Sequence, residues 1–281
     1  MKVRHKIALG YIKTKLNLLT LLSSKKAGEE AFRLFCTPLI RGRVPENEVF
    51  KNAEKLSFSL SGKNVLGYRC NHPGRHKILL LHGFSSTCQH FAGFVTPLVK
   101  KGYEVLAFDA PAHGSSEGSS VNAVEYAQMI KKINDLYGPI SGYIAHSFGG
   151  ISVILALEEM NHDAETRVVL LAPATETSTA IDSAFEMLQI KNFTLRKAID
   201  DVILEKSGRP SAWYSIRRAI KTIKASILWI HDTDDNITPY GDALKVKNDS
   251  PENVLFIATS GLGHRRIYRD AEVLEQVISF F

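Results

Sequence analysis

The sequence lacks an apolar run long enough to cross a membrane, since no stretch of about 18 uninterrupted apolar residues occurs, and we expect no transmembrane helix. Cysteine is scarce: three residues lie far apart without a C-x-x-C pair, which favours free thiols and a reducing, cytoplasmic compartment. The H-E-x-x-H metal pattern and both common Gly-rich phosphate loops are also missing. We therefore expect no metal and no cofactor.

Net charge is absent over most of the chain. The first 50 residues hold ten Lys and Arg against four Asp and Glu, whereas the other 231 residues hold 25 of each. The net charge of +6 therefore belongs entirely to the N-terminal segment. A nucleic-acid-binding domain carries its basic residues on a working face, so we expect no nucleic-acid partner.

Residues 1–35 have the pattern of one or two amphipathic helices. Apolar residues recur at helical spacing, at Ile12, Leu16, Leu19 and Leu22. Lys13 and Lys15 interrupt this pattern, which argues against a signal peptide. Two interpretations remain: a basic helix on an anionic membrane surface, or, as we favour, a helical arm that packs on its own domain or on a second subunit.

The remainder of the chain alternates between predicted strands and helices. Strands are predicted at residues 56–60, 65–70, 77–82, 103–108, 143–145, 167–171, 227–231 and 254–258, with a hairpin turn at 61–64. Helices are predicted at residues 91–101, 121–137, 151–157 and 270–281. This alternation predicts an α/β fold with a mostly parallel, doubly wound sheet over residues 51–281, preceded by a basic helical arm at 1–50.

Residues 174–223 contain no strand-like run and are interrupted only by a Gly-Arg-Pro break at 208–210. They predict a short helical insertion that acts as a lid. Its large apolar residues are Phe185, Met187, Leu188, Phe193 and Leu195. They would either line an acyl pocket or pack within the lid itself, and the sequence does not decide between the two.

The segment around Ser147 predicts an exposed nucleophile. A short apolar strand ends at Ala145, Ser147 follows two residues later, and Gly149 precedes an apolar helical run. Ala145 and Gly149 are small enough for a strand to turn sharply into a helix. A serine at such a turn is held in a strained conformation at a helix N-terminus, where unpaired N–H groups favour negative charge.

The other informative polar residues also follow predicted strands. His82 ends one strand, three aspartates (Asp232, Asp234 and Asp235) follow another, and His264 follows the last. Ligands in open α/β sheets bind at the carboxyl ends of the strands. The chemical order along the chain is therefore Ser, Asp, His.

Five segments resemble motifs of the α/β-hydrolase family. They are residues 82–84 (H-G-x), 109–115 (D-x-P-x-H-G-x), 145–149 (the nucleophile elbow), 230–239 (the acid segment) and 261–265 (G-x-G-H-x). Ala112, Ala145 and Asp232 stand where the family usually has glycine. The resemblance runs from about residue 56 to 281 and implies the α/β-hydrolase fold.

The resemblance also implies roles for individual residues. Ser147 would be the nucleophile and His264 the base that takes its proton. Spacing within the acid segment selects Asp235, four residues before Pro239, as the carboxylate that orients His264. Asp234 is the second choice. We expect the unused aspartates to lie in a solvated loop, with one of them capping the helix after Pro239.

The backbone N–H groups of Phe84 and Phe148 would form the oxyanion hole, and His82 and His113 would support loops beside the site. The implied function is a serine hydrolase that cleaves a small or medium carboxylic ester through an acyl-enzyme. Thioester, amide or carbon–carbon bond hydrolysis would use the same residues. The alternative is a non-catalytic protein of this fold that binds a ligand or partner.

Overall fold

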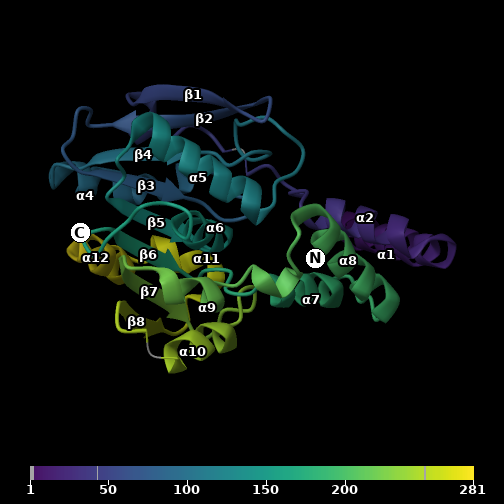
Figure 1. Cartoon of the computed structure of the whole chain (residues 1–281). Coiled ribbons are helices and arrows are strands. Elements are labelled where there is room, and N and C mark those ends of the chain that lie inside the picture. The colour runs from purple at the N-terminus through teal and green to yellow at the C-terminus, as the bar shows by residue number, and fades with distance from the viewer. Residues whose placement is uncertain (1–2, 43, 250) are drawn as a thin grey trace. The chain divides into compact units, whose positions relative to one another are not determined.

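A computed structural model describes residues 3–42, 44–249 and 251–281, with side chains from residue 9 onward in these ranges. These residues form two compact units (Figure 1). The helical unit combines Met1–Thr37 with Glu176–Ser215, and the sheet unit combines Pro38–Thr175 with Ile216–Phe281. Within the described ranges, no helix has both the length and the apolar character needed to cross a membrane.

The sheet unit contains eight strands in the order β1-β2-β4-β3-β5-β6-β7-β8. Their bounds are β1 Glu54–Leu60, β2 Lys63–Cys70, β3 Lys77–Leu81, β4 Glu104–Phe108, β5 Gly142–His146, β6 Arg167–Leu171, β7 Ser226–Asp232 and β8 Val254–Thr259. Strand β2 runs antiparallel to β1 and β4, and all other pairs are parallel. The predicted strands and the mostly parallel sheet are therefore confirmed.

Helices cover both faces of this sheet (Figure 1). The longer ones are α4 Ala92–Lys100, α5 Ala123–Tyr137, α6 Phe148–Leu157, α10 Tyr240–Asn248 and α12 Ala271–Phe280. Short helical turns are α3 Glu48–Lys51, η1 Cys88–Phe91, α9 Ile216–Ala219, η3 Ile220–Thr222, α11 Gly263–Arg266 and η4 Ile267–Arg269. Helix α5 packs on α6, and α4 packs on α12.

The central strands are buried on both faces, as their continuous apolar runs predict. Ile78 and Leu80 of β3 belong to one apolar core, which also contains residues of α4 and α12. Leu79 and Leu81 point to the opposite face and are fully buried as well. A strand with two buried faces cannot alternate apolar and polar residues, which is why this part of the sequence reads as an unbroken apolar run.

The predicted hairpin is tighter than the sequence suggests. Strand β1 ends at Leu60 and β2 begins at Lys63, so the loop consists of Ser61 and Gly62 alone. Both residues have positive φ, 49° and 76°. This is the two-residue geometry that matches the twist of antiparallel strands, and glycine at the second position adopts it without steric cost.

The helical unit contains α1 (Val3–Leu22), α2 (Ser24–Phe35), α7 (Thr177–Met187), α8 (Phe193–Ser207) and the turn η2 (Ser211–Trp213). Its core joins both chain segments: Leu16, Ala27 and Ala31 pack with residues of α7 and α8. Gly28 permits this approach, since a Cβ there would lie 2.5 Å from the Ala198 carbonyl oxygen.

The helices predicted within residues 1–35 are confirmed as α1 and α2, but the apolar residues that recur there at helical spacing are only partly buried. Leu16 is buried and Ile12 and Leu19 are partly buried against the core. Leu22, in contrast, is 84% exposed. Leu22 follows Leu16 by six residues, which places it about 120° away around the helix axis, on the face that points away from the core. The expected division of the chain at residue 50 stays a prediction.

The five apolar residues considered for an acyl pocket have two different environments. Phe185, Leu188 and Leu195 pack in the core of the helical unit. Met187 and Phe193 are exposed, at 54% and 83%. Three of the five therefore have the packing role that the sequence left open. The lid role of residues 174–223 stays a prediction.

Candidate active site

Ser147 lies at a sharp turn between β5 and α6. Its φ and ψ are 53° and −116°, a region that non-glycine residues rarely adopt and that persists only when the surroundings impose it. The Ser147 N–H donates to the Leu171 carbonyl (3.1 Å), which anchors the turn to β6. Gly149 fits directly beneath β3, because a Cβ there would lie 2.6 Å from the Leu81 carbonyl oxygen.

The three residues chosen from the sequence meet in a hydrogen-bonded chain. The Ser147 hydroxyl donates to Nε2 of His264 at 3.0 Å. On its other side, the His264 Nδ1–H donates to Oδ2 of Asp235 at 2.7 Å. All three residues are buried, with at most 8% of their surface exposed. These are the distances required for proton transfer from a hydroxyl to an imidazole oriented by a carboxylate.

Asp235 is held as a carboxylate. Burial alone would raise its pKa, but hydrogen bonding and the charge of His264, together with the backbone N–H groups of Ile237 and Thr238, lower the pKa overall. These two N–H groups donate to Oδ1 at 2.8 and 2.9 Å. Oδ2 is thereby left for His264 and the Thr238 hydroxyl. An ionised Asp235 holds the His264 tautomer that keeps Nε2 free to accept a proton.

The other two aspartates of the segment differ from expectation. Asp232 is fully buried rather than solvated, and its carboxylate accepts from the Thr259 hydroxyl (2.7 Å) and the Leu262 N–H (3.0 Å). It thus ties the end of β7 to the loop that carries His264. Asp234 is exposed and accepts from the Gly261 N–H at 2.8 Å. Neither caps the next helix, whose first-turn N–H groups receive no side-chain cap.

Thr238 is a neighbour of the site that the sequence pattern gave no role. Its hydroxyl lies 2.9 Å from Oδ2 of Asp235, 3.0 Å from Nδ1 of His264 and 3.1 Å from the Ala172 carbonyl oxygen. It is therefore placed to fix the carboxylate beside the imidazole. Its position in the acid segment is the only signal that could have suggested this role.

Phe84 lies in the loop after β3, and Phe148 is the first residue of α6, directly after the serine. Their rings meet edge to face, with centroids 5.5 Å apart. Among the hydrogen bonds of the described residues, none uses the backbone N–H of either residue. The chain before Phe84 passes close to the nucleophile, since a Cβ on Gly83 would lie 3.0 Å from the Ser147 Cβ. Two unused N–H donors next to a serine hydroxyl can stabilise an oxyanion.

His82 and His113 fasten the loops around the site. His82 donates Nδ1–H to the Gly83 carbonyl (2.8 Å) and accepts from the Ala110 N–H (2.9 Å). His113 accepts the Ser85 N–H at Nε2 (2.9 Å). Burial lowers the pKa of both imidazoles, that of His113 to about 3, so both remain neutral. The loop-supporting role expected for them is thus their structural role.

Asp109 has a similar role that was not singled out from the sequence. Its side chain accepts from the Thr87 hydroxyl (2.7 Å), the Cys88 N–H (2.9 Å) and the Ser115 N–H (2.8 Å). It therefore joins the loop after β4 to the loop after β3. Gly114 is required beside it, because a Cβ there would lie 2.0 Å from Oδ2 of Asp109.

His146 links the nucleophile to the base through the backbone. Its Nε2–H donates to the His264 carbonyl oxygen at 2.9 Å, and the two rings lie 4.7 Å apart. Burial and the nearby His264 lower the pKa of His146 to about 3, so it remains a neutral donor. The sequence places His146 next to Ser147 but does not reveal this bond, which joins residues 118 positions apart.

Clusters of titratable residues elsewhere do not suggest a metal centre. Among the residues with described side chains, no group of three or more His, Cys, Asp or Glu has an arrangement that would hold a metal ion.

The chain matches known proteins over most of its length. A family model described as serine aminopeptidase, S33, covers residues 72–233, which include Ser147. The hydrolase YugF of Bacillus subtilis (strain 168), itself uncharacterized, is 23% identical over 266 residues, which cover 80% of this chain and 96% of that protein.

Two solved structures share the fold. The esterase Pf2001 of Pyrococcus furiosus superposes with a TM-score of 0.64 at 19% identity, covering 87% of this chain and 97% of that one. Est1E of Butyrivibrio proteoclasticus, solved with ferulic acid bound, also has a TM-score of 0.64, at 18% identity and with 80% and 97% coverage. Because the family model covers more than half of its residues, the chain belongs to the serine aminopeptidase S33 family of α/β hydrolases.

Proposed function

We propose that this protein is a serine hydrolase that cleaves small or medium carboxylic esters through an acyl-enzyme on Ser147. The observation that carries the proposal is the hydrogen-bonded chain from Asp235 through His264 to the Ser147 hydroxyl. This chain argues against the alternative of a non-catalytic binding protein, which has no use for an imidazole aligned on a buried serine.

In the first half of the reaction, Ser147 Oγ attacks the ester carbonyl carbon while its proton moves to His264 Nε2. The negative charge that develops on the carbonyl oxygen is stabilised by the N–H groups of Phe84 and Phe148. The bond to the leaving alkoxy group then breaks, and His264 returns the proton to it. The alcohol leaves, and the acyl group remains on Ser147.

In the second half, a water molecule replaces the alcohol. His264 takes its proton as the oxygen attacks the acyl carbon, and the same N–H pair stabilises the second tetrahedral intermediate. Collapse of this intermediate releases the carboxylic acid and returns the proton to Ser147. Asp235 stabilises the imidazolium in both halves without accepting its proton.

One comparison favours an ester over an amide, since Pf2001 is named an esterase. Est1E was solved with ferulic acid, a carboxylic acid that hydrolysis of either an ester or an amide would release. The family description names an aminopeptidase. The substrate test therefore has to include an aminoacyl amide beside the esters.

The experiment is labelling with a fluorophosphonate, followed by peptide mapping, together with a series of p-nitrophenyl esters of increasing acyl length and leucine p-nitroanilide. We expect one adduct on Ser147 and turnover of the shorter esters. Ser147→Ala should lose both, while Ser24→Ala, which removes an exposed hydroxyl from α2, should keep both. Turnover of the anilide alone would replace the ester proposal with peptide hydrolysis, and absence of any adduct on folded protein would support the binding-protein alternative.

A further inference from the structure

Helix α1 carries large apolar side chains on the face that points away from the core of the helical unit. Leu9 and Leu16 are buried on the inner face. On the outer face, the exposed residues are Tyr11 (68%), Leu18 (57%), Leu21 (83%) and Leu22 (84%). We call these four residues the α1 stripe.

The α1 stripe follows the helical repeat. Tyr11, Leu18 and Leu22 are separated by seven and four residues, so their side chains lie within about 40° of one another around the helix axis. Leu21 extends the apolar surface at the C-terminal end of α1. Single exposed apolar residues need no explanation, but a row of them on one helix does.

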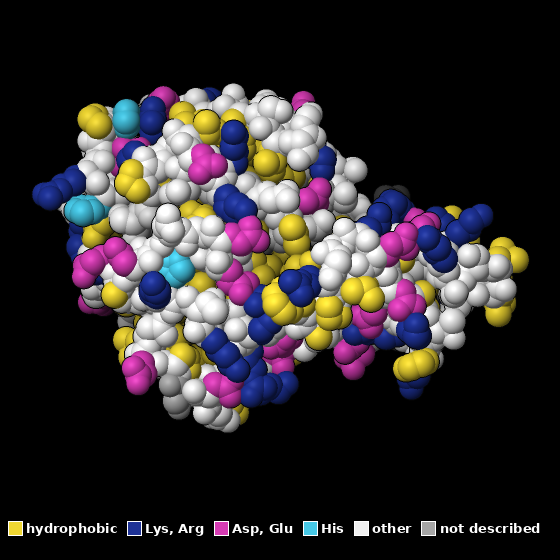
Figure 2. All heavy atoms as spheres, in the orientation of Figure 1, with side chains coloured by type: hydrophobic (Ala, Val, Ile, Leu, Met, Phe, Trp, Pro, Cys, Tyr) yellow, Lys and Arg dark blue, Asp and Glu magenta, His cyan; other side chains and the backbone are white. Residues whose placement is uncertain are grey.

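The surroundings of the α1 stripe are basic. Residues 1–37 contain eight Lys and Arg and two Asp and Glu. Lys15 is paired with Glu30 at 2.7 Å, but no ion pair in the described part of the chain includes Lys13 or Lys26. Figure 2 shows hydrophobic and basic side chains, with fewer acidic ones among them, exposed over the region of α1 and α2.

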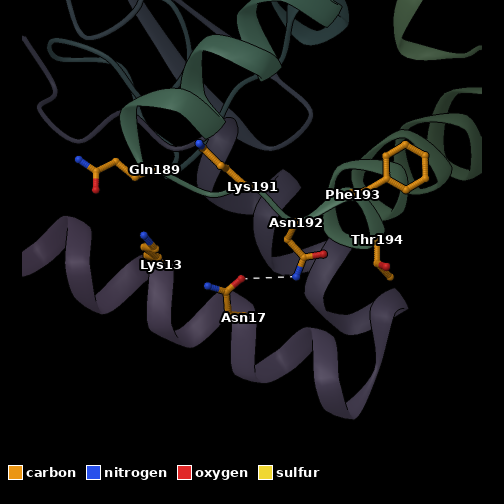
Figure 3. A pocket seen from close by; sticks show the side chains of 7 residues that line it. All are labelled: Lys13, Asn17, Gln189, Lys191, Asn192, Phe193 and Thr194. Atoms are coloured by element: carbon orange, nitrogen blue, oxygen red, sulfur yellow. Dashed lines mark hydrogen bonds between the residues drawn. The ribbon is translucent and has the colours of Figure 1, made fainter.

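A groove beside α1 adds to this positive surface (Figure 3). It has a volume of about 830 Å³ and is lined by Lys13, Asn17, Gln189, Lys191, Asn192, Phe193 and Thr194. Lys13 and Lys191 face it from α1 and from the loop before α8. Phe193, at the start of α8, is 83% exposed.

We propose that α1 docks this protein on the surface of an anionic membrane, with the α1 stripe in the lipid interface and the neighbouring lysines at the headgroups. An interfacial helix needs an apolar face and basic flanks, which α1 has. α1 would lie in the plane of the membrane, since no described helix is both long and apolar enough to cross it. This surface belongs to the helical unit alone.

Charge favours a membrane over a second copy of the chain. A symmetric dimer formed through the α1 stripe would bring two segments of net charge +6 together, whereas anionic lipids complement that charge. Size points the same way: a stable protein interface uses about 20–30 residues on each side, and the stripe has four.

The test measures co-sedimentation of the full-length protein with vesicles of phosphatidylcholine alone and of phosphatidylcholine with phosphatidylserine. We expect binding to the anionic vesicles that weakens as salt screens the lysines. The double variant Leu18→Gln/Leu22→Gln should bind roughly tenfold more weakly or worse, because it removes two exposed apolar side chains. Lys13→Gln and Lys26→Gln should each weaken binding about fivefold.

The matched control is Leu136→Gln, which makes the same change at an exposed position of α5 in the sheet unit. It should bind as the wild type does. Circular dichroism of each variant shows whether it has folded, and the readout does not depend on hydrolysis.

Two outcomes would overturn the proposal. One is equal binding of Leu18→Gln/Leu22→Gln and wild type, or binding to neither type of vesicle. The other is a wild-type dimer by light scattering that becomes a monomer in Leu18→Gln/Leu22→Gln without any vesicle binding, which would assign the α1 stripe to a second copy.

Discussion

The two units of this chain depart from the ordinary rule of apolar residues inside and polar residues outside, and they do so in opposite ways. The sheet unit has 22 basic and 21 acidic residues and buries polar side chains at the carboxyl ends of its strands. The helical unit has 13 and 8, a net charge of +5, and leaves the α1 stripe exposed.

Each departure is costly unless something compensates for it. A buried polar group needs hydrogen-bond partners, and Asp235, His264 and Asp109 all have them. An exposed apolar row needs another surface to cover it. The sheet unit therefore has the geometry for chemistry, and the helical unit has the surface for docking.

The largest predicted effect is on hydrolysis by the sheet unit, and it leaves vesicle binding by the helical unit unchanged. Ser147→Ala should lower hydrolysis of an accepted ester by roughly 10⁴- to 10⁶-fold, since the nucleophile and its base act as one group. Binding to anionic vesicles should not change, because the α1 stripe is untouched. Hydrolysis is measured as a progress curve and vesicle binding by co-sedimentation, both on the same preparation. Loss of both properties in Ser147→Ala would show that the two units do not have separate roles.

The next largest effect identifies which of the three aspartates orients His264. Asp235→Asn should lower kcat by roughly 10⁴-fold, because an amide donates to Nδ1 and leaves the proton on Nε2. Asp234→Asn is the matched control and should retain most activity, since the exposed Asp234 side chain accepts only from the Gly261 N–H among the described contacts. Steady-state kinetics of both variants tests this prediction. A large loss in Asp234→Asn with little loss in Asp235→Asn would assign the orientation of His264 to Asp234.

Much of the sheet unit could be predicted because its signals are local. The central parallel strands are short apolar runs, and each polar residue of the site lies at or shortly after the end of such a run, as Ser147 follows β5. A parallel sheet gathers these ends at one edge without further information. The meeting of Ser147, Asp235 and His264 thus follows from their order along the chain.

The parts that could not be predicted depend on contacts between distant segments. The bond from His146 to the His264 carbonyl and the burial of Asp232 against the His264 loop have no local pattern. The helical unit is the extreme case, since α2 packs on α8, more than 150 residues later. An amphipathic repeat shows which face of a helix is apolar, but it does not show which other segment of the chain packs against that face.

A smaller effect is expected at His146, which we regard as a positioning residue. His146→Phe removes the donor to the His264 carbonyl and should lower kcat by roughly 10- to 100-fold with little change in KM, since a misplaced base slows the chemical step. His146→Gln retains an N–H and should recover part of the loss. If both variants lost kcat equally, and in proportion to the drop in their melting temperatures, His146 would have only a packing role.

The last effect concerns the pH dependence of stability rather than the rate of hydrolysis. Buried His113 and His146 have pKa values of about 3 in the folded chain against an ordinary 6.5, so both resist protonation when folded. A group with a lowered folded pKa stabilises the fold fully above its unfolded pKa, and this stability is lost as the pH falls toward the folded value. The sheet unit should therefore weaken from about pH 6.5 downward, by about 2 kcal/mol per histidine near pH 5.

The helical unit should respond in a lower window. Its partly buried Glu30 has a pKa that is lowered to about 2, first by the hydrogen bond to Arg33 and also by Lys15. This contribution to stability begins to fall only below the ordinary pKa of 4.5.

Hydrogen exchange followed by mass spectrometry, corrected for intrinsic rates, resolves peptides of both units. Between about pH 6 and 5, faster exchange should appear in peptides of β5 and of the Asp235 segment but not in α2 and α8. Simultaneous loss of protection in both would mean that the chain unfolds as one cooperative body, and the two units would then differ in surface but not in stability.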